Sequence, residues 1–432
     1  MKIHVMNSLV QGGAANAAKQ LTRSLQSQNV DASLFYCRRF RDEVDDDLNG
    51  RLVGARWTGS LLHKLQAAVR FRLHRQDFKR AMKKRPSGLE IFSSPAGAPL
   101  TPWPPTNLTL SGSDVLHLHW VAKMIDYPSF FRNIPSELPI VWTLHDMNPF
   151  TGGCHFSVGC DRFTEGCGSC PQLLPEGESP QNDISRSGFD TKATAIRHLN
   201  LHVVAPSRWL IEQAQKSPLF AHARSFRRIP YGLADECFDS VISKDEARRQ
   251  LDIESDTFVF CFGAADVAAT RKGAHLLLPA ITQLAENNPG RKLLGLVFGG
   301  GQLPESSIPI RSFGFLKGRR DLMRIFSACD VFVVPSLEDN LPITAMEAMA
   351  GGAAMLGFNT SGVPDLVIDG VTGRLAPRVE CQDLARLLIE MARDLDATRE
   401  QGLQAKAMAD KHFRAEREAD DYIRLYNELL ST

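Results

Sequence analysis

The residues best suited to chemistry are charged side chains that follow buried strands. Arg271 and Lys272 stand immediately before Gly273, where the expected helix Gly273–Glu286 begins. Two cations beside a helix N-terminus favour a diphosphate, because the helix end carries partial positive charge. Taken alone, a solvated basic pair ahead of a helix is the commoner interpretation.

Two acidic residues follow a second, very apolar stretch. Asp339 lies in the turn after the expected strand Val331–Pro335, and Glu347 lies in the helix that comes next. Ligands of open α/β sheets bind outside the carboxyl ends of the strands. Carboxylates placed there can accept hydrogen bonds from sugar and ribose hydroxyls. The alternative is a pair of helix-start and surface acids, but the position at a strand end favours a functional role.

Glycine and histidine residues mark strand ends in the first half of the chain. Gly12 and Gly13 open the first expected helix, where glycines let a phosphate approach backbone N–H groups. A tight turn explains these two residues equally well. His117 and His119 end one expected strand, and His145 follows the next. Histidines at two neighbouring strand ends predict one shared crevice.

Cysteines gather in one short, glycine-rich segment. Cys154, Cys160, Cys167 and Cys170 fall within it, and the last two form a C-x-x-C. This spacing predicts a structural tetrahedral zinc site, with His155 as a substitute ligand. A redox C-x-x-C and four unrelated thiols are the alternatives. Four protein ligands would leave no position for a catalytic water, so zinc would only hold the shape of the loop.

The elements that position these residues alternate between strands and helices. Apolar runs typical of buried parallel strands are Lys2–Met6, Ala32–Tyr36, Asp114–Trp120, Pro139–Leu144, Leu201–Ala205, Phe258–Gly263, Leu293–Phe298, Val331–Pro335 and Ala353–Phe358. Helical patterns include Ala14–Gln26, Gly273–Glu286, Ile343–Ala350 and Glu416–Leu430. Ser243 and Glu246 form a capping box. Repeated strand–helix units predict an α/β fold with two doubly wound parallel sheets.

Length and composition indicate an ordinary globular protein of two domains. The 432 residues exceed what one hydrophobic core usually supports. The chain is 43% hydrophobic and 23% charged, with a net charge of +1, so nothing indicates a nucleic-acid partner. The first residues are too polar for a signal peptide, and no run approaches the roughly 18 apolar residues of a membrane span. We therefore expect a cytoplasmic protein whose cysteines form no disulfide framework.

One region departs from this neutrality. Arg51–Pro86 contains eleven lysines and arginines and the single acid Asp77. Apolar residues recur in it at helical spacing, at Leu62, Leu65, Val69 and Leu73. This pattern predicts a basic amphipathic helix. It either lies on an anionic membrane surface, which would attach the protein to the inner face of a membrane, or packs as a solvated helix on the first domain.

Together these segments resemble glycosyltransferase family 4, which has the GT-B fold, over nearly the whole chain. The most specific parts are Ile229–Gly232, Arg271–Gly273, Cys329–Ser336 and Met346–Gly352. The run from Trp142 through the four cysteines to Pro171 resembles a subgroup associated with exopolysaccharide and lipid-linked glycan assembly, including colanic-acid-type enzymes.

The resemblance implies two Rossmann-like, doubly wound domains that face a central cleft. The expected acceptor-side domain is 1–210, with the basic helix at 51–86 and a cysteine-rich loop at 151–171. The expected donor-binding domain is 211–412. The last helix, 413–432, is expected to pack back on the first domain.

The resemblance also assigns roles to matching residues. The catalytic set holds the transferred sugar and neutralises the leaving diphosphate; its members are His145, Asp339, Lys272 and Arg271. The donor-binding set approaches the distal phosphate, the sugar, the base and the ribose; its members are Gly12, Gly13, Asn340, Leu341, Gly314, Phe315, Leu316 and Glu347. Two positions depart from the family pattern, Asp339 in place of a frequent Glu and Ala264 in place of a frequent Arg, which bears mainly on the identity of the donor.

The implied function is retaining transfer of a hexose from a UDP- or GDP-sugar to a glycan or polyprenyl-lipid-linked acceptor. The expected pathway is exopolysaccharide or cell-surface glycan biosynthesis, and catalysis needs no metal or other cofactor. Two alternatives remain. One is a GT-B-fold sugar-nucleotide epimerase, and the other is a non-catalytic protein that binds sugar nucleotides.

Overall fold

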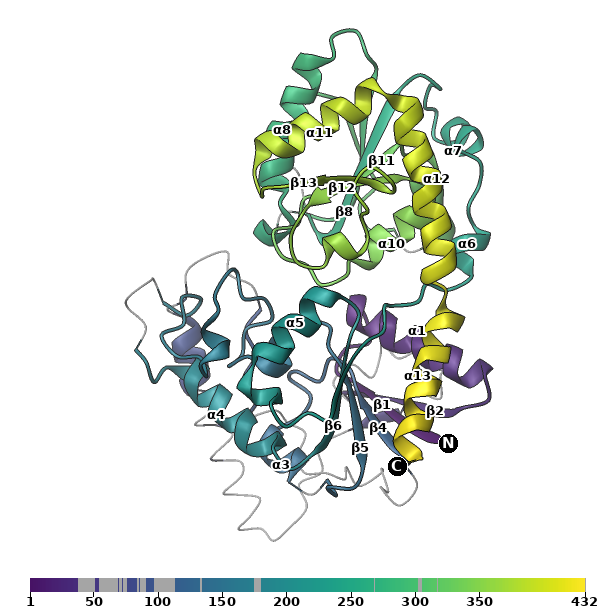
Figure 1. Cartoon of the computed structure of the whole chain (residues 1–432). Coiled ribbons are helices and arrows are strands. Elements are labelled where there is room, and N and C mark those ends of the chain that lie inside the picture. Colours follow the sequence, from purple (N-terminus) through teal and green to yellow (C-terminus); the bar gives the residue numbers. More distant parts are fainter. Residues whose placement is uncertain are drawn as a thin grey trace. The chain divides into compact units, whose positions relative to one another are not determined.

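A computed structural model describes residues 1–37, 51–53, 69, 72, 76–83, 85, 91–96, 113–132, 134–174, 180–267, 269–301, 305–316 and 318–431. The chain divides into two compact units, Met1–Ile229 with Ala419–Thr432, and Pro230–Glu418. Each unit consists of a parallel sheet with helices on both faces (Figure 1). The expected α/β fold with two parallel sheets is confirmed.

The first unit contains a seven-stranded parallel sheet of order β3-β2-β1-β4-β5-β6-β7. Its strands are β1 (Lys2–Asn7), β2 (Asp31–Cys37), β3 (Arg51–Val53), β4 (Val115–Leu118), β5 (Pro139–Thr143), β6 (Asn200–Ala205) and β7 (Ser225–Arg228). Strand order reverses between β1 and β4. In sheets of this kind the reversal opens a crevice at the carboxyl ends, where ligands bind.

Helices cover both faces of this sheet because the strand residues are apolar on both sides. Val141 of β5 packs in the cluster that includes α1 (Gly13–Ser27) and the last helix, α13 (Ala415–Leu430). Its neighbour Trp142 packs on the other face, with α3 (Tyr127–Phe131), α4 (Ile184–Ile196) and α5 (Arg208–Lys216). Single 3-10 turns occur at η3 (Asn148–Phe150), η4 (Arg162–Thr164) and η5 (Pro218–Phe220).

The second unit contains a six-stranded parallel sheet of order β10-β9-β8-β11-β12-β13, which reverses between β8 and β11. Its strands are β8 (Phe258–Asp266), β9 (Leu293–Gly300), β10 (Ile310–Ser312), β11 (Val331–Val334), β12 (Ala354–Phe358) and β13 (Gly373–Ala376). Its helices are α6 (Glu236–Asp239), α7 (Lys244–Gln250), α8 (Ala274–Asn287), α9 (Arg319–Ala328), α10 (Ile343–Ala350), α11 (Cys381–Arg393) and α12 (Leu395–His412), with 3-10 turns η6 (Thr270–Lys272) and η7 (Val363–Asp365).

All nine expected strands occur, and the structure adds β3, β7, β10 and β13. These four are the edge strands of the two sheets. The expected start of α7 is confirmed, since the Ser243 hydroxyl accepts a hydrogen bond from the Glu246 N–H at 3.2 Å. The division between the units differs from the expected one. Helix α5 and strand β7 belong to the first unit, which therefore extends to Ile229 rather than to residue 210.

The basic region Arg51–Pro86 is not one helix from its start, because Arg51–Val53 pairs with β2 as strand β3. Helical residues described within it are Val69, Arg72 and 76–83, whereas Leu62, Leu65 and Leu73 lie outside the described residues. Phe78 and Met82 pack against a buried cluster of Phe92, Cys170 and Leu173. No helix in the described ranges is long and apolar enough to cross a membrane.

Candidate functional site

The basic pair and the strand-end acid of the second unit meet at the point where strand order reverses. Lys272 follows β8, and its Nζ lies 2.5 Å from Oδ2 of Asp339, which follows β11. Nη1 of Arg271 lies 3.6 Å from the same oxygen. Nη1 of Arg271 also donates to the Glu338 carbonyl at 2.8 Å, and the backbone carbonyl of Arg271 accepts from the Leu337 N–H at 2.8 Å. The two loops are therefore joined through one carboxylate.

Asp339 stays ionised although it is buried. Burial acts to raise the pKa of its carboxyl, but Lys272 and then Arg271 outweigh burial and hold that pKa below its usual value. Its Oδ2 also accepts a hydrogen bond from the Ser336 hydroxyl at 3.3 Å, and its Oδ1 accepts one from the Asn340 N–H at 3.1 Å. The result is a buried anion surrounded by donors, with two cations that a phosphate could also attract.

Glycines allow these loops to approach each other. Gly273 has a φ of +75°, and a Cβ added to it would lie 1.8 Å from the Pro335 carbonyl oxygen. A Cβ added to Gly362, in the loop after β12, would lie 1.3 Å from the Asn340 carbonyl oxygen. Backbone therefore packs directly on backbone around Asp339, which places Leu341 in a buried position beside it.

Glu347 lies in α10, eight positions after Asp339 in the sequence, and pairs with a different cation. Its Oε1 accepts a hydrogen bond from Nη1 of Arg319, the first residue of α9. Burial raises the pKa of the Glu347 carboxyl above its usual value, and Arg319 only partly opposes this. The ion pair links α10 to the segment that follows β10.

That segment contains Gly314, Phe315 and Leu316, the expected border of the base. Gly314 has a φ of +59°, and its carbonyl accepts a hydrogen bond from the Gly299 N–H at 2.8 Å. Phe315 is 69% exposed, although it is a large apolar side chain. An exposed aromatic ring at the carboxyl edge of a sheet is a suitable surface for a flat, apolar group to stack on.

In the first unit, Gly12 is the N-cap of α1 in the turn after β1, and Gly13 is the first residue of that helix. Gly12 has a φ of +99°, which explains a glycine there. Gly13 has no such constraint, and an added Cβ would meet no atom within 4 Å. Neither packing nor backbone conformation requires a glycine at position 13. Its missing side chain leaves space in front of the N-terminus of α1.

Three histidines form a stack beside this turn, at the carboxyl ends of β4 and β5. Nδ1 of His119 lies 2.9 Å from Nε2 of His145, and the His117 ring centroid lies 4.3 Å from that of His119. His117 is bonded through Nε2 to the Thr143 hydroxyl at 2.8 Å and through Nδ1 to the Tyr426 hydroxyl at 2.7 Å. Burial lowers the pKa of His117 to about 3 and that of His145 to about 4, so both rings are neutral.

A second hydrogen-bonded group follows β5 and has the connectivity of a Ser-His-Asp triad. Oδ2 of Asp146 lies 2.6 Å from Nδ1 of His155, whose Nε2 lies 2.9 Å from the Ser93 hydroxyl. Trp120 also donates to Asp146, at 2.7 Å. Ser93 is only 2% exposed and His155 only 1%. A nucleophile needs access to substrate, so this group joins three segments of the chain rather than performing acyl transfer.

The structure does not support the predicted zinc site. Among the described residues no group of three or more His, Cys, Asp or Glu side chains could hold a metal ion. Both ring nitrogens of His155 are bonded to other side chains, so it cannot act as the substitute ligand. The four cysteines do line one small cavity of about 20 Å³: Cys154, Cys160, Cys167 and Cys170. Burial raises the thiol pKa of Cys167 to about 11 and that of Cys170 to about 12.

Hydrogen bonds order the cysteine-rich loop instead. The buried Lys192 of α4 donates to the carbonyls of Asn148 and Thr151, the latter at 2.9 Å. The Asp183 carboxylate accepts from the Cys170 N–H at 2.7 Å. The sequence pattern could not reveal these bonds, because Lys192 and Asp183 lie outside the cysteine-rich segment.

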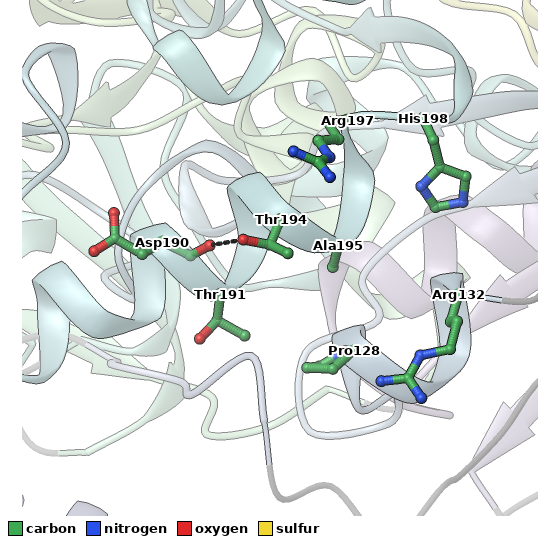
Figure 2. Close-up of a pocket in the computed structure, with 8 residues that line it drawn as sticks. All are labelled: Pro128, Arg132, Asp190, Thr191, Thr194, Ala195, Arg197 and His198. Atoms are coloured by element: carbon green, nitrogen blue, oxygen red, sulfur yellow. Dashed lines mark hydrogen bonds between the residues drawn. The ribbon is translucent and has the colours of Figure 1, made fainter.

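The first unit also has a surface hollow of about 620 Å³ between α3 and α4 (Figure 2). Arg132, Arg197 and His198 are among the residues that line it. It lies before the start of β5 and β6, whereas His145 follows the end of β5. Arg132 and Arg197 are the C-cap residues of their helices, where positive charge complements the helix dipole. The hollow is therefore separate from the strand-end residues.

Sequence reasoning missed several residues that the structure brings to the strand ends. Arg319 had a recognisable signal, since a cation at a helix N-terminus opposes the helix dipole unless an acid such as Glu347 pairs with it. Ser361, whose hydroxyl accepts the Asp339 N–H at 3.1 Å, has a positive φ of 48° that no sequence pattern indicated. Tyr426 lies far from His117 in the sequence, so only the fold reveals the hydrogen bond between them.

Comparison with known proteins agrees with this geometry. Residues 257–394 match the family described as Glycosyl transferases group 1. A D-inositol 3-phosphate glycosyltransferase of Corynebacterium diphtheriae is 30% identical over 316 residues, which are 67% of this chain and 64% of that protein. The chain thus spans less than two thirds of the length of the curated relatives it matches.

Two solved structures share the fold across both chains. Sucrose-phosphate synthase from Thermosynechococcus elongatus aligns with a TM-score of 0.67 at 16% identity, covering 100% of this chain and 99% of that one. Anabaena HepE, solved in complex with UDP-glucose, aligns with a TM-score of 0.60 at 15% identity, covering 99% and 100%. The chain therefore has the GT-B fold, and its residues 257–394 match the group 1 glycosyl transferases.

Proposed function

We propose that this protein is a retaining glycosyltransferase that moves a hexose from a nucleotide-sugar donor to a glycan acceptor. The observation that carries the proposal is the cluster of Arg271, Lys272 and Asp339 where strand order reverses in the second unit. Two cations and a buried carboxylate there suit a substrate that has both a diphosphate and a hydroxylated ring. The group 1 family match spans all three residues.

In the proposed complex, Lys272 and Arg271 bind the diphosphate and neutralise its charge as it leaves. The Asp339 carboxylate accepts hydrogen bonds from the transferred sugar, and the N–H groups of Asn340 and Leu341 donate hydrogen bonds to it. Preorganised charge of this kind is usually the largest single contribution to catalysis. Lys272 must then exchange its contact with Asp339 for one with phosphate. During this exchange Arg271 can remain paired with Asp339.

Glu347 accepts hydrogen bonds from the ribose hydroxyls, and Phe315 borders the base with Gly314 and Leu316. Gly12 and Gly13 at the N-terminus of α1 suit a phosphate, and His145 at the carboxyl edge of the first sheet suits a sugar hydroxyl. The space in front of Gly13 supports this assignment. UDP is the favoured nucleotide, because HepE, with the same fold, was solved with UDP-glucose; GDP is the alternative.

The proposed reaction breaks the bond between the anomeric carbon and the diphosphate oxygen and forms a bond to the acceptor oxygen on the same face. The acceptor proton passes to the leaving phosphate. The cations stabilise the leaving group, so no divalent metal is required. Closure around the donor would exclude water and favour transfer over hydrolysis.

The acceptor is proposed to be a glycan or a polyprenyl-linked glycan of exopolysaccharide or cell-surface assembly, on the resemblance of the cysteine-rich run. A polyol phosphate is the second candidate, suggested by the name of the C. diphtheriae relative. An acceptor panel should contain both classes. Retention is read from the anomeric proton coupling of the product by NMR.

Incubation with UDP-, GDP- and dTDP-sugars without acceptor tests the proposal against its two alternatives. A transferase should slowly release free sugar and nucleoside diphosphate. An isomerised sugar nucleotide would instead indicate the epimerase, and binding without turnover would indicate a non-catalytic binder. Calorimetry with UDP on Glu347→Gln adds a site-specific check, with an expected loss of affinity of about tenfold. Unchanged affinity would remove Glu347 from the ribose site.

A lipid-linked acceptor suggests cytoplasmic action at an anionic membrane surface. Phe78 and Met82 pack inward, whereas Lys79, Arg80 and Lys83 are exposed on residues 76–83. Attachment through this segment would then be electrostatic rather than by insertion. Co-sedimentation with phosphatidylserine vesicles should be strong at low salt and fall as salt rises. Absence of binding at low salt would leave only a solvated helix.

A further inference from the structure

The contact between His119 and His145 assigns a role to a residue that would otherwise count as core. His119 follows β4, His145 lies two residues beyond β5, and the two strands are neighbours in the sheet. Nδ1 of His119 lies 2.9 Å from Nε2 of His145. The ring planes are 28° apart, with centroids separated by 5.1 Å.

Backbone hydrogen bonds and ring packing hold His119 in place. Its backbone N–H donates to the Met6 carbonyl at 2.9 Å, and its carbonyl accepts from the indole N–H of Trp142 at 3.2 Å. The His117 ring packs against its ring, and His117 is itself bonded at both nitrogens. His119 is only 2% exposed. A side chain fixed in this way offers its neighbour a single, rigid contact.

The hydrogen-bond pattern indicates which atom carries the proton. Both rings are neutral, because burial lowers the pKa of each, and neighbouring histidines lower that of His119 further. A neutral imidazole has one N–H, so only one ring can donate in this contact. Nε2 of His119 has no partner among the described residues. Buried N–H groups without an acceptor are rarer than under-used acceptors. The proton of His119 therefore belongs on Nδ1.

We propose that His119 is a positioning residue for His145. It donates from Nδ1 to Nε2 of His145, which fixes that ring and places the single proton of His145 on Nδ1. His145 then acts at the carboxyl edge of the first sheet as a neutral N–H donor, suited to a sugar hydroxyl or a phosphate oxygen. This part of the inference rests on the proposed glycosyl transfer, whereas the tautomer itself does not.

Two near-isosteric variants separate the two ring nitrogens. In His119→Asn the amide nitrogen can occupy the place of Nδ1 and still donate to His145. In His119→Gln it reaches toward the place of Nε2 instead. His119→Ala removes both. His202→Asn is the matched control, since His202 is a hydrogen-bonded histidine of β6 that contacts Asn200 and Ser225.

The first readout is the tautomer of His145 in the free protein, from long-range ¹H–¹⁵N correlation of labelled histidines, assigned with His145→Gln. The wild type, His119→Asn and His202→Asn should show the Nδ1–H form. His119→Gln and His119→Ala should lose it. An Nε2–H form in the wild type, or an unchanged spectrum in His119→Gln, would overturn the proposal. Melting curves identify any variant that fails to fold. If several variants fail to fold, the tautomer of His145 in the wild type tests the proposal by itself.

The second readout is turnover of the nucleotide sugar. His119→Gln should lower kcat by about threefold to tenfold with KM for the donor little changed, and His119→Asn should restore most of it. Normal kcat in His119→Gln, with an altered tautomer, would overturn the role of His119 in the reaction. Absence of turnover in the wild type, with the expected tautomers, would count against the proposed function and leave the assignment of the proton intact.

Discussion

The two sheets reverse their strand order in the same way, yet the residues at the two reversals differ in charge. In the second unit the loops after β8 and β11 are joined by ion pairs of Lys272 and Arg271 with Asp339. In the first unit the ends of β4 and β5 are joined by neutral, stacked histidines. The topology thus provides the place, and the loop residues determine its electrostatics.

The difference also concerns readiness to bind. The ion pairs of the second unit must rearrange before an anion can replace Asp339 beside Lys272. The histidines of the first unit are fixed by packing and by hydrogen bonds to one another, to Thr143 and to Tyr426. The second unit thus provides exchangeable charge, and the first unit provides a rigid donor.

The largest expected contrast is in response to acid. His117 and His145 have folded-state pKa values of about 3 and about 4, below the ordinary 6.5. At pH values between the folded and the ordinary pKa, the unfolded chain therefore binds more protons than the folded chain. Unfolding free energy of the first unit should therefore fall as pH drops from about 6.5 toward 4, by about 1.4 kcal/mol per pH unit for each such histidine. The pKa of Asp339 lies below 3.8, so its ion pairs should persist through this range.

Tryptophan fluorescence isolates this effect, because all five tryptophans precede Ile229 and none lies in the second unit. Urea midpoints from fluorescence should decrease between pH 7 and pH 4.5. Circular dichroism should show a second component that changes much less. A fluorescence midpoint independent of pH would show that the histidines are not buried as neutral groups.

Lys272→Ala tests the charged edge. Loss of one such charge-stabilising group should lower kcat by ~10²–10³. Stability should change little, because Arg271 remains 3.6 Å from the carboxylate of Asp339. Lys292→Ala is the control: this half-exposed lysine pairs with the surface acids Glu254 and Asp256 and should leave kcat unchanged. Near-normal turnover of Lys272→Ala would remove the lysine from the mechanism.

Two glycine substitutions compare the edges directly. Gly273→Ala forces a Cβ against the Pro335 carbonyl at a φ of +75° and should destabilise the second unit by more than about 2 kcal/mol. Gly13→Ala meets no atom within 4 Å and should leave the melting temperature within a few degrees. If α1 receives a phosphate, Gly13→Ala should nevertheless lower donor affinity. If Gly13→Ala is stable and fully active, Gly13 has no role in binding the donor.

The smallest expected effect concerns the support of the histidines. Tyr426→Phe removes the hydroxyl bonded to His117 and should cost about 1–2 kcal/mol in the unfolding transition seen by fluorescence. Asn427→Ala, on the exposed side of the same helix, should cost nearly nothing. Equal stability of the two variants would mean that the His117–Tyr426 contact contributes little.

The sequence predicted the central strands because they are covered on both faces and read as continuous apolar runs. The edge strands were not predicted, because an edge strand is less covered and its sequence need not be continuously apolar. For example, β7 reads Ser-Phe-Arg-Arg and β10 reads Ile-Arg-Ser. Motif positions such as Lys272 and Asp339 were recognised, but their direct contact was not, because it joins residues 67 positions apart. The structure does not support the zinc interpretation, since no group of three or more potential ligands among the described residues could hold a metal ion. The substitute ligand His155 is bonded at both ring nitrogens to Asp146 and Ser93, which spacing could not show.

The path of the chain has a consequence for how the protein is made. The first unit ends at Ile229 but also contains Ala419–Thr432, so one face of its sheet is fully covered only by residues that follow the whole second unit. The Tyr426 hydroxyl that bonds His117 is separated from it by 309 positions. At about 5–20 residues per second, a ribosome needs roughly 15–60 s to make that interval. During that interval the nascent first unit lacks α13, whereas the second unit can already fold. The unit made later is therefore the first that can be complete.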